Sequence, residues 1–140
     1  MNQYAEKLLS ELPEDSAYVV LRPENRRYLT GITSSNGMVL ICAEKQVFYT
    51  DFRYITMARN DIRAGYDVEL LKKSFAATLA EDLPEGVKTV YFEDEYLSYR
   101  EYRAFADALS HRFELVGDEK VLSDLRIVKT ADEIEKIVTA

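Results

Sequence analysis

Short apolar runs with the character of β-strands most constrain the fold of this 140-residue sequence. They are rich in β-branched and aromatic residues, as strands in a packed sheet are. The runs are 17–21, 38–43, 46–50, 67–71, 89–92 and 113–116. Only Glu44-Lys45 separates the second run from the third, which predicts an antiparallel hairpin.

Helical patterns lie between these runs. Apolar residues recur at three- and four-residue spacing in the segments 5–12, 52–62, 74–83 and 98–112, and the segments 23–31 and 121–125 are also predicted to be helical. After residue 50, strands and helices alternate along the chain. The sequence therefore predicts an α/β fold, with a mixed β-sheet of about six strands flanked by helices on both faces.

Several helix ends carry recognisable signals. Pro23 is suited to a first helical turn, and Gly31 is suited to a left-handed C-terminal cap. The segments 98–101 and 130–133 both have the spacing of a capping box. The helical pattern that starts at the second box runs to Ala140 without a stop signal, so we expect it to continue in a longer parent protein.

Composition excludes several classes of function. The net charge of -7 argues against nucleic-acid binding and against an anionic membrane surface. The longest uncharged apolar run, 38–43, is far too short to span a bilayer, and the N-terminus lacks the apolar region of a signal peptide. Cys42 and His111 are the only residues of their types, which disfavours a disulfide or a zinc site and favours the cytoplasm.

The acidic residues at strand ends are the first candidates for chemistry. Asp51 stands between a strand and a helix, where a carboxylate commonly caps the helix; Arg53 offers an ion pair with an acidic neighbour instead. Asp51 and the run 93–95 could together form a two-metal nuclease site. We favour a solvated acidic turn for 93–95, because adjacent side chains diverge along an extended backbone.

Other patterns are weaker. Arg22, Arg26 and Arg27 form a small basic cluster, and the loop 33–37 lacks the lysine of a phosphate-binding loop. Tyrosines recur at three-residue spacing at positions 96, 99 and 102, which is typical of packing but also suits a protein interface. No catalytic constellation emerges from the residues alone.

Four segments, in order, nevertheless resemble a known family. They are PENRRYLTGI at 23–32, TSSNG at 33–37, FYTDFRY at 48–54 and LRIVKTADEIE at 125–135. Together they are similar to the N-terminal domain of the creatinase/prolidase group, the Xaa-Pro dipeptidases and aminopeptidases P. In that family the pattern reads N-x-x-Y-L-T-G-F-T-G-S-N-G, then T-D-x-R-Y, then L-R-x-x-K-x-x-x-E-I. Ile32 and Ser34 depart from it.

The resemblance implies a domain of ribonuclease H-like appearance over residues 1–128, with 129–140 starting a linker helix. The parent's C-terminal domain would carry the catalytic residues and two divalent metals (Mn, Co or Zn), leaving no catalytic residue, metal or cofactor here. The implied partners are that catalytic domain, a second copy in a homodimer and a proline-containing dipeptide or peptide. The residues implied at the rim of the partner's active site are Thr33, Ser34, Ser35, Asn36, Gly37, Asp51, Arg53 and Tyr54.

The resulting expectation is a non-catalytic domain of a cytoplasmic, metal-dependent Xaa-Pro peptidase, inactive on its own. The loop 33–37 is expected to act as a lid over the site rather than as a plain connector. Three alternatives remain: an interaction module of a catalytically inactive relative such as a histone-chaperone subunit, a domain of a creatinase-type amidinohydrolase, and the nuclease considered above.

Overall fold

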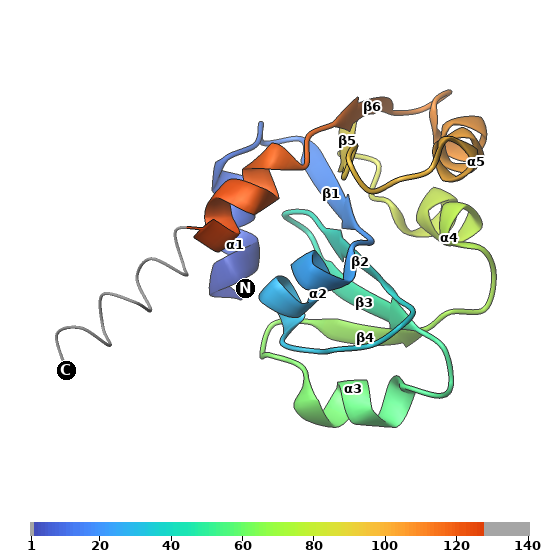
Figure 1. Cartoon of the computed structure of the whole chain (residues 1–140). Helices are drawn as coiled ribbons and strands as arrows, with labels where there is room; N and C mark the ends of the chain where they lie inside the picture. Colours follow the sequence, from blue (N-terminus) through green and yellow to red (C-terminus); the bar gives the residue numbers. More distant parts are fainter. Residues whose placement is uncertain (1, 128–140) are drawn as a thin grey trace, which may run out of the picture.

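A computed structural model of the chain describes residues 2–127. Figure 1 shows a β-sheet with helices on both faces. The elements are α1 (Gln3–Ser10), β1 (Ser16–Val20), α2 (Pro23–Thr30), β2 (Met38–Ile41), β3 (Gln46–Thr50), α3 (Ile55–Asp61), β4 (Asp67–Leu70), α4 (Phe75–Asp82), β5 (Thr89–Phe92), α5 (Tyr99–Leu109) and β6 (Glu114–Gly117). A further helix covers 120–127. The predicted α/β fold and its strands are confirmed.

The six strands form one mixed sheet in the order β4-β3-β2-β1-β5-β6. The predicted hairpin is present, since β2 pairs antiparallel with β3, as it does with β1. The pairs β3–β4, β1–β5 and β5–β6 are parallel. Every strand except β2 therefore runs in the same direction, and their carboxyl ends meet at one edge of the sheet.

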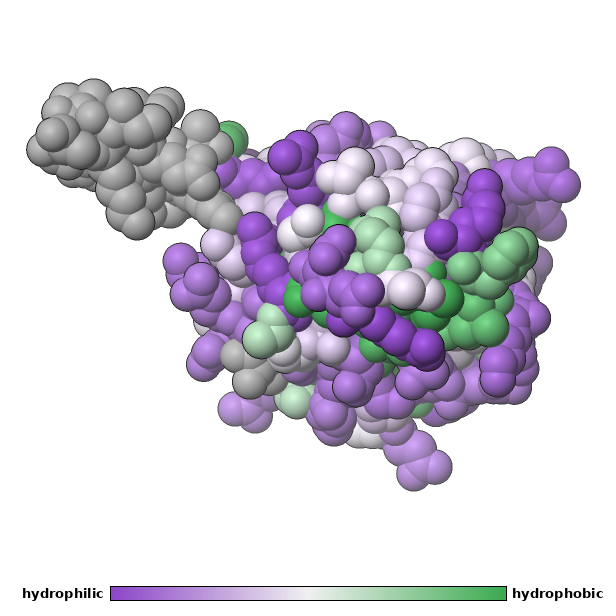
Figure 2. Space-filling view, turned by 90° about the horizontal axis from the view of Figure 1, so that it is seen from below, coloured by the Kyte–Doolittle hydropathy of each residue, from purple (hydrophilic) through white to green (hydrophobic). Residues whose placement is uncertain are grey.

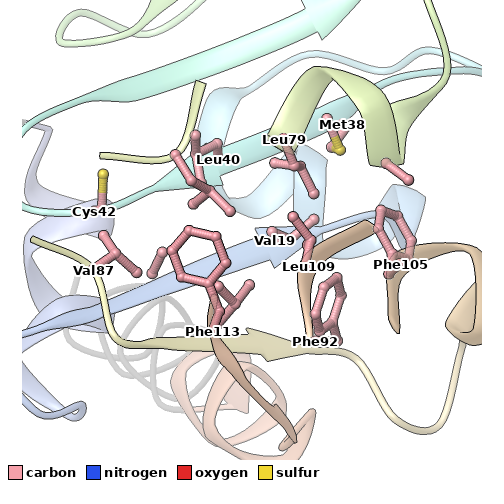
Figure 3. Close-up of a cluster of buried hydrophobic side chains, with 14 of the residues drawn as sticks. Val19, Met38, Leu40, Cys42, Leu79, Val87, Phe92, Phe105, Leu109 and Phe113 are labelled. Atoms are coloured by element: carbon pink, nitrogen blue, oxygen red, sulfur yellow. The ribbon is translucent and has the colours of Figure 1, made fainter. Parts of the chain in front are cut away.

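Strand alternation divides the core into two layers. Ala17, Val19 and Leu21 face one layer, whereas Tyr18 and Val20 face the other. The first layer packs against α4 and α5, and Figure 3 shows Leu79, Phe105 and Leu109 meeting side chains of the sheet there. The second layer packs against α1, α2, α3 and the helix 120–127. Both sheet faces are thus covered, which accounts for the continuous burial of β1, β2 and β3.

The helix-end signals act as expected where they are described. Gly31 ends α2 with a φ of 80°, in the left-handed region that glycine adopts without strain. Ser98 and Glu101 form both hydrogen bonds of the capping box at the start of α5. The second capping box lies outside the described residues. Within the described range, no helix has the length and apolar character needed to cross a membrane.

Candidate functional site

Two loops meet at the edge formed by the carboxyl ends of the strands. The loop 33–37 leads into β2, and the segment 51–54 leaves β3 beside it, because Met38 and Tyr49 are paired across the hairpin. Two side-chain contacts join the loops. The hydroxyls of Ser35 and Tyr54 are 2.7 Å apart, and Asn36 Nδ2 donates to Asp51 Oδ2 over 3.4 Å. We call residues 33–37 and 51–54 the loop pair.

Asp51 does not cap the following helix, so that prediction is wrong. Helix α3 begins only at Ile55, and its first turn receives no side-chain cap. Instead, Asp51 Oδ1 accepts from the Arg53 backbone N–H over 2.9 Å, and Asp51 Oδ2 pairs with Arg53 Nη2 at 2.8 Å. The alternative of an ion pair is therefore correct, with Asp51 itself as the acid. The hydrogen bond from Arg53 lowers the pKa of the Asp51 carboxyl below its ordinary range.

The loop pair also presents apolar surface. The Phe52 side chain is 79% exposed, and Leu70, exposed as well, lies at the end of the strand paired with β3. Figure 2 shows apolar residues gathered toward one side of the face that it presents, between hydrophilic ones. The Arg53 guanidinium lies over the Tyr54 ring, 5.3 Å from the ring centroid. An exposed ring beside a guanidinium and a carboxylate suits contact with a peptide or protein.

The base of the loop 33–37 is fixed from within the protein. Arg26, buried in α2, donates from Nη2 to the Ser34 carbonyl over 2.7 Å and from Nη1 to the Gly37 carbonyl over 2.9 Å. Ser34 is itself buried, whereas Thr33 and Ser35 are exposed. Gly37 packs closely on Phe48, whose Cε2 would lie 2.9 Å from an added Cβ. Thr33 and the tip of the loop are thus presented to the outside, while Ser34 and Gly37 are held inside.

The prediction of a solvated acidic turn at 93–95 is wrong for Glu93. Its side chain is buried, and its carboxylate accepts from the backbone N–H groups of Leu21 and Arg22 and from Asn25 Nδ2. Burial raises the pKa of the Glu93 carboxyl, although these three donors favour the charged form. Glu119, also buried, pairs with Arg22 at 2.9 Å. We call Arg22, Asn25, Glu93 and Glu119 the buried acid cluster.

The nuclease alternative loses its ligands in this arrangement. Both oxygens of Glu93 are occupied by N–H donors, while Asp94 and Glu95 are exposed. In the part of the chain that the structure describes, no group of three or more His, Cys, Asp or Glu side chains could hold a metal ion. Cys42 is buried, as expected for a core residue.

The remaining candidates separate in space. Arg26 is buried, Arg22 belongs to the buried acid cluster and Arg27 is exposed, so the three arginines do not form one basic surface. The tyrosines at 96, 99 and 102 are all exposed, which favours the interface interpretation over packing. Tyr99 and Tyr102 line part of an apolar pocket of about 260 Å³ at the ends of β5 and β6, whereas Tyr96 does not.

The fold and the loop pair belong to an α/β domain built on one mixed six-stranded sheet, and comparison with known proteins identifies its family. Residues 6–128 match the model of the Creatinase/Prolidase N-terminal domain. The chain belongs to this family. The resemblance drawn from the four sequence segments is therefore confirmed.

Relatives and solved structures agree with this assignment. The chain is 32% identical over 112 residues to the uncharacterized peptidase YqhT of Bacillus subtilis, covering 79% of this chain and 31% of that protein. An Xaa-Pro dipeptidase from Bacillus anthracis shares the fold with a TM-score of 0.78 at 28% identity, over 87% of this chain and 34% of that one. The N-terminal domain of the cytoplasmic peptidase PepQ from Mycobacterium tuberculosis has a TM-score of 0.77 at 27% identity, over 89% and 99%. The chain thus spans about a third of the length of the curated relatives that it matches.

Proposed function

We propose that this chain is the non-catalytic N-terminal domain of a cytoplasmic Xaa-Pro dipeptidase or aminopeptidase P-like metallopeptidase. In this proposal the domain contributes to dimerisation, and the loop pair forms part of the rim of the partner subunit's active site. The observation that carries it is the convergence of all eight rim residues at one edge of the sheet, joined by the contacts Ser35–Tyr54 and Asn36–Asp51. The names of the relatives, Xaa-Pro dipeptidase and putative Xaa-Pro aminopeptidase, support the substrate class.

The proposal divides the labour between two domains. Peptide hydrolysis and the two divalent metals, Mn, Co or Zn, belong to a C-terminal catalytic domain. In this proposal residues 1–128 form the N-terminal domain, and 129–140 begin the connection to the catalytic part. The chain's own contribution is then to shape the pocket and to fix the subunit arrangement, without supplying a reacting group.

The chemistry of the loop pair fits a rim that contacts a short peptide. Ser35 and Asn36 offer a hydroxyl and an amide, which can donate or accept hydrogen bonds. Asp51 and Arg53 place a carboxylate and a guanidinium side by side, and these groups complement the charged ends of a dipeptide. Phe52 supplies an exposed ring that would be buried against the wall of a partner subunit.

A chimaera tests this proposal. The chain replaces the matching N-terminal segment of the Bacillus anthracis Xaa-Pro dipeptidase, and hydrolysis of several Xaa-Pro dipeptides is measured with Mn²⁺ or Co²⁺. We expect activity in the chimaera and none in the 140-residue chain alone. In the chimaera, Ser35→Ala with Asn36→Ala should raise KM or shift substrate preference while leaving metal content unchanged.

The matched control is Asn60→Ala with Ser110→Ala, two exposed polar residues outside the loop pair. Unchanged kinetics of the Ser35/Asn36 variant across all substrates would contradict the rim function. Hydrolysis by the chain alone, above a metal-only blank, would contradict the division of labour.

A further inference from the structure

The guanidinium of Arg26 donates hydrogen bonds to three backbone carbonyls in two separate segments. Besides the Ser34 and Gly37 carbonyls, it donates from Nη1 to the Leu21 carbonyl, over 2.7 Å, where the chain leaves β1. The side chain is only 4% exposed. One buried cation thus links the end of a central strand to both sides of the loop tip, which consists of Ser35 and Asn36.

Arg26 has an unusual set of partners for a buried charge. Buried arginines are normally paired with a carboxylate, because an unpaired charge is costly to remove from water. Among the described residues, however, no carboxylate lies within ion-pair distance of Arg26, and its hydrogen bonds go to backbone carbonyls. The charges of Glu93 and Glu24 act on it only through space. These hydrogen bonds hold the backbone of the loop 33–37 in place.

We propose that Arg26 is the positioning residue of the loop pair: it holds the backbone at Ser34 and Gly37 so that the side chains of Ser35 and Asn36 reach Tyr54 and Asp51. An effect of this positioning on peptide binding rests on the function proposed above. The positioning itself is argued from the hydrogen bonds of Arg26 alone.

Leu21 shows how the positioning is anchored. Its carbonyl accepts from Arg26, while its N–H donates to the buried Glu93 carboxylate. The two residues before α2, Leu21 and Arg22, are therefore held by Glu93, which directly follows β5, and Leu21 is held in addition by the side chain of Arg26. A planar guanidinium can direct donors to three acceptors at once, whereas the single nitrogen of lysine, on a shorter reach, cannot reproduce this fork.

The test compares Arg26→Lys and Arg26→Gln with Arg27→Lys and Arg27→Gln in the full chain. Arg27 is the adjacent, exposed residue of the same helix and serves as the matched control. Backbone ¹⁵N relaxation gives order parameters for residues 34–37 and for the core strands. We expect values near 0.85 throughout in the unchanged chain, and a fall below about 0.6 at Ser35 and Asn36 alone in both Arg26 variants.

Several outcomes would overturn the positioning role. Unchanged order at Ser35 and Asn36 would do so, as would a uniform loss of order across the core or failure of both Arg26 variants to fold, since each would show a role in the fold as a whole. The same variants in the chimaera separate this inference from the proposed function. A loosened tip with raised KM supports both, whereas a loosened tip with unchanged KM supports the positioning and contradicts the rim function.

Discussion

The buried acid cluster and the loop pair occupy the same edge of the sheet but treat their carboxylates in opposite ways. Glu93 is 1% exposed and is held by backbone and amide donors, and burial raises its pKa. Asp51 lies at the surface in a pair with Arg53, which lowers its pKa. Residue type does not distinguish the two. Burial and the choice of partner place the first carboxylate in the interior and leave the second partly exposed beside its arginine.

Glu93→Ala is the strongest test of this difference between the two carboxylates. Removal of the carboxylate leaves the N–H groups of Leu21 and Arg22 and the amide of Asn25 without their acceptor in a buried place. We expect a loss of about 3 kcal/mol in the free energy of unfolding, because unpaired buried donors carry their full desolvation cost. Urea unfolding measures the loss. The exposed neighbour Glu95→Ala should change stability by less than ~0.5 kcal/mol, and equal effects of the two substitutions would refute a structural role for Glu93.

Gly37→Ala tests whether the base of the loop pair is as tightly packed as the buried acid cluster. The added Cβ would lie 2.9 Å from Phe48 Cε2 and 3.3 Å from the Tyr49 carbonyl oxygen. Because that ring is buried and the carbonyl belongs to the sheet, we expect a loss of about 2 kcal/mol. At Gly86 the nearest atom to an added Cβ is Glu44 Oε1 at 3.6 Å, so Gly86→Ala is the control. If Gly37→Ala lowers the free energy of unfolding no more than Gly86→Ala does, the base of the loop is not tightly packed.

Sequence alone predicted the elements well but not the state of the acids. The strands and the caps at Gly31 and Ser98 follow from local patterns, whereas the predicted cap at Asp51 does not form. The two loop segments named from the resemblance lie in contact in the fold. Glu93 was missed because its three donors come from residues 21–25, far away in sequence and adjacent only through the β1–β5 pairing. Arg26 was missed for the same reason, since its acceptors depend on how the loop folds back over α2. The one signal in the sequence was that Glu93 directly follows a buried strand. The local pattern of three adjacent acids favoured a solvated turn instead.

Because the pKa of Glu93 is raised and that of Asp51 is lowered, the two carboxyl groups should affect stability differently as pH changes. The raised pKa of Glu93 means that the stability linked to its protonation is fully present below its ordinary value of 4.5 and is lost as pH rises through the folded-state pKa. The deficit of Glu93→Gln relative to the unchanged chain should therefore shrink as pH rises. Asp51, with a lowered pKa, contributes above its ordinary value of 3.8 and loses that contribution as pH falls.

The deficit of Asp51→Asn should accordingly shrink as pH falls below about 3.8. Urea unfolding of the three proteins across a pH series measures both trends. Asn25 provides a structural reason for the first trend. Its Oδ1 is buried and has no hydrogen-bond partner among the described residues, so after rotation of the amide it can accept from a protonated Glu93. Parallel pH profiles for the two variants would contradict the distinction between the clusters.

Tyr54→Phe should have the smallest effect on stability, because it removes only the exposed-loop contact with Ser35. Water replaces the lost partner of Ser35, so we expect a change within ~0.5 kcal/mol in urea unfolding. Tyr49→Phe is the matched control: the same atom is removed from a buried ring whose hydroxyl donates to Asp82 Oδ2 over 2.7 Å. There the loss should reach about 1.5 kcal/mol, as for hydrogen bonds to charged groups. A larger loss of unfolding free energy for Tyr54→Phe than for Tyr49→Phe would mean that the contact between the two loops stabilises the fold. That result would contradict the interpretation of the loop pair as a binding rim.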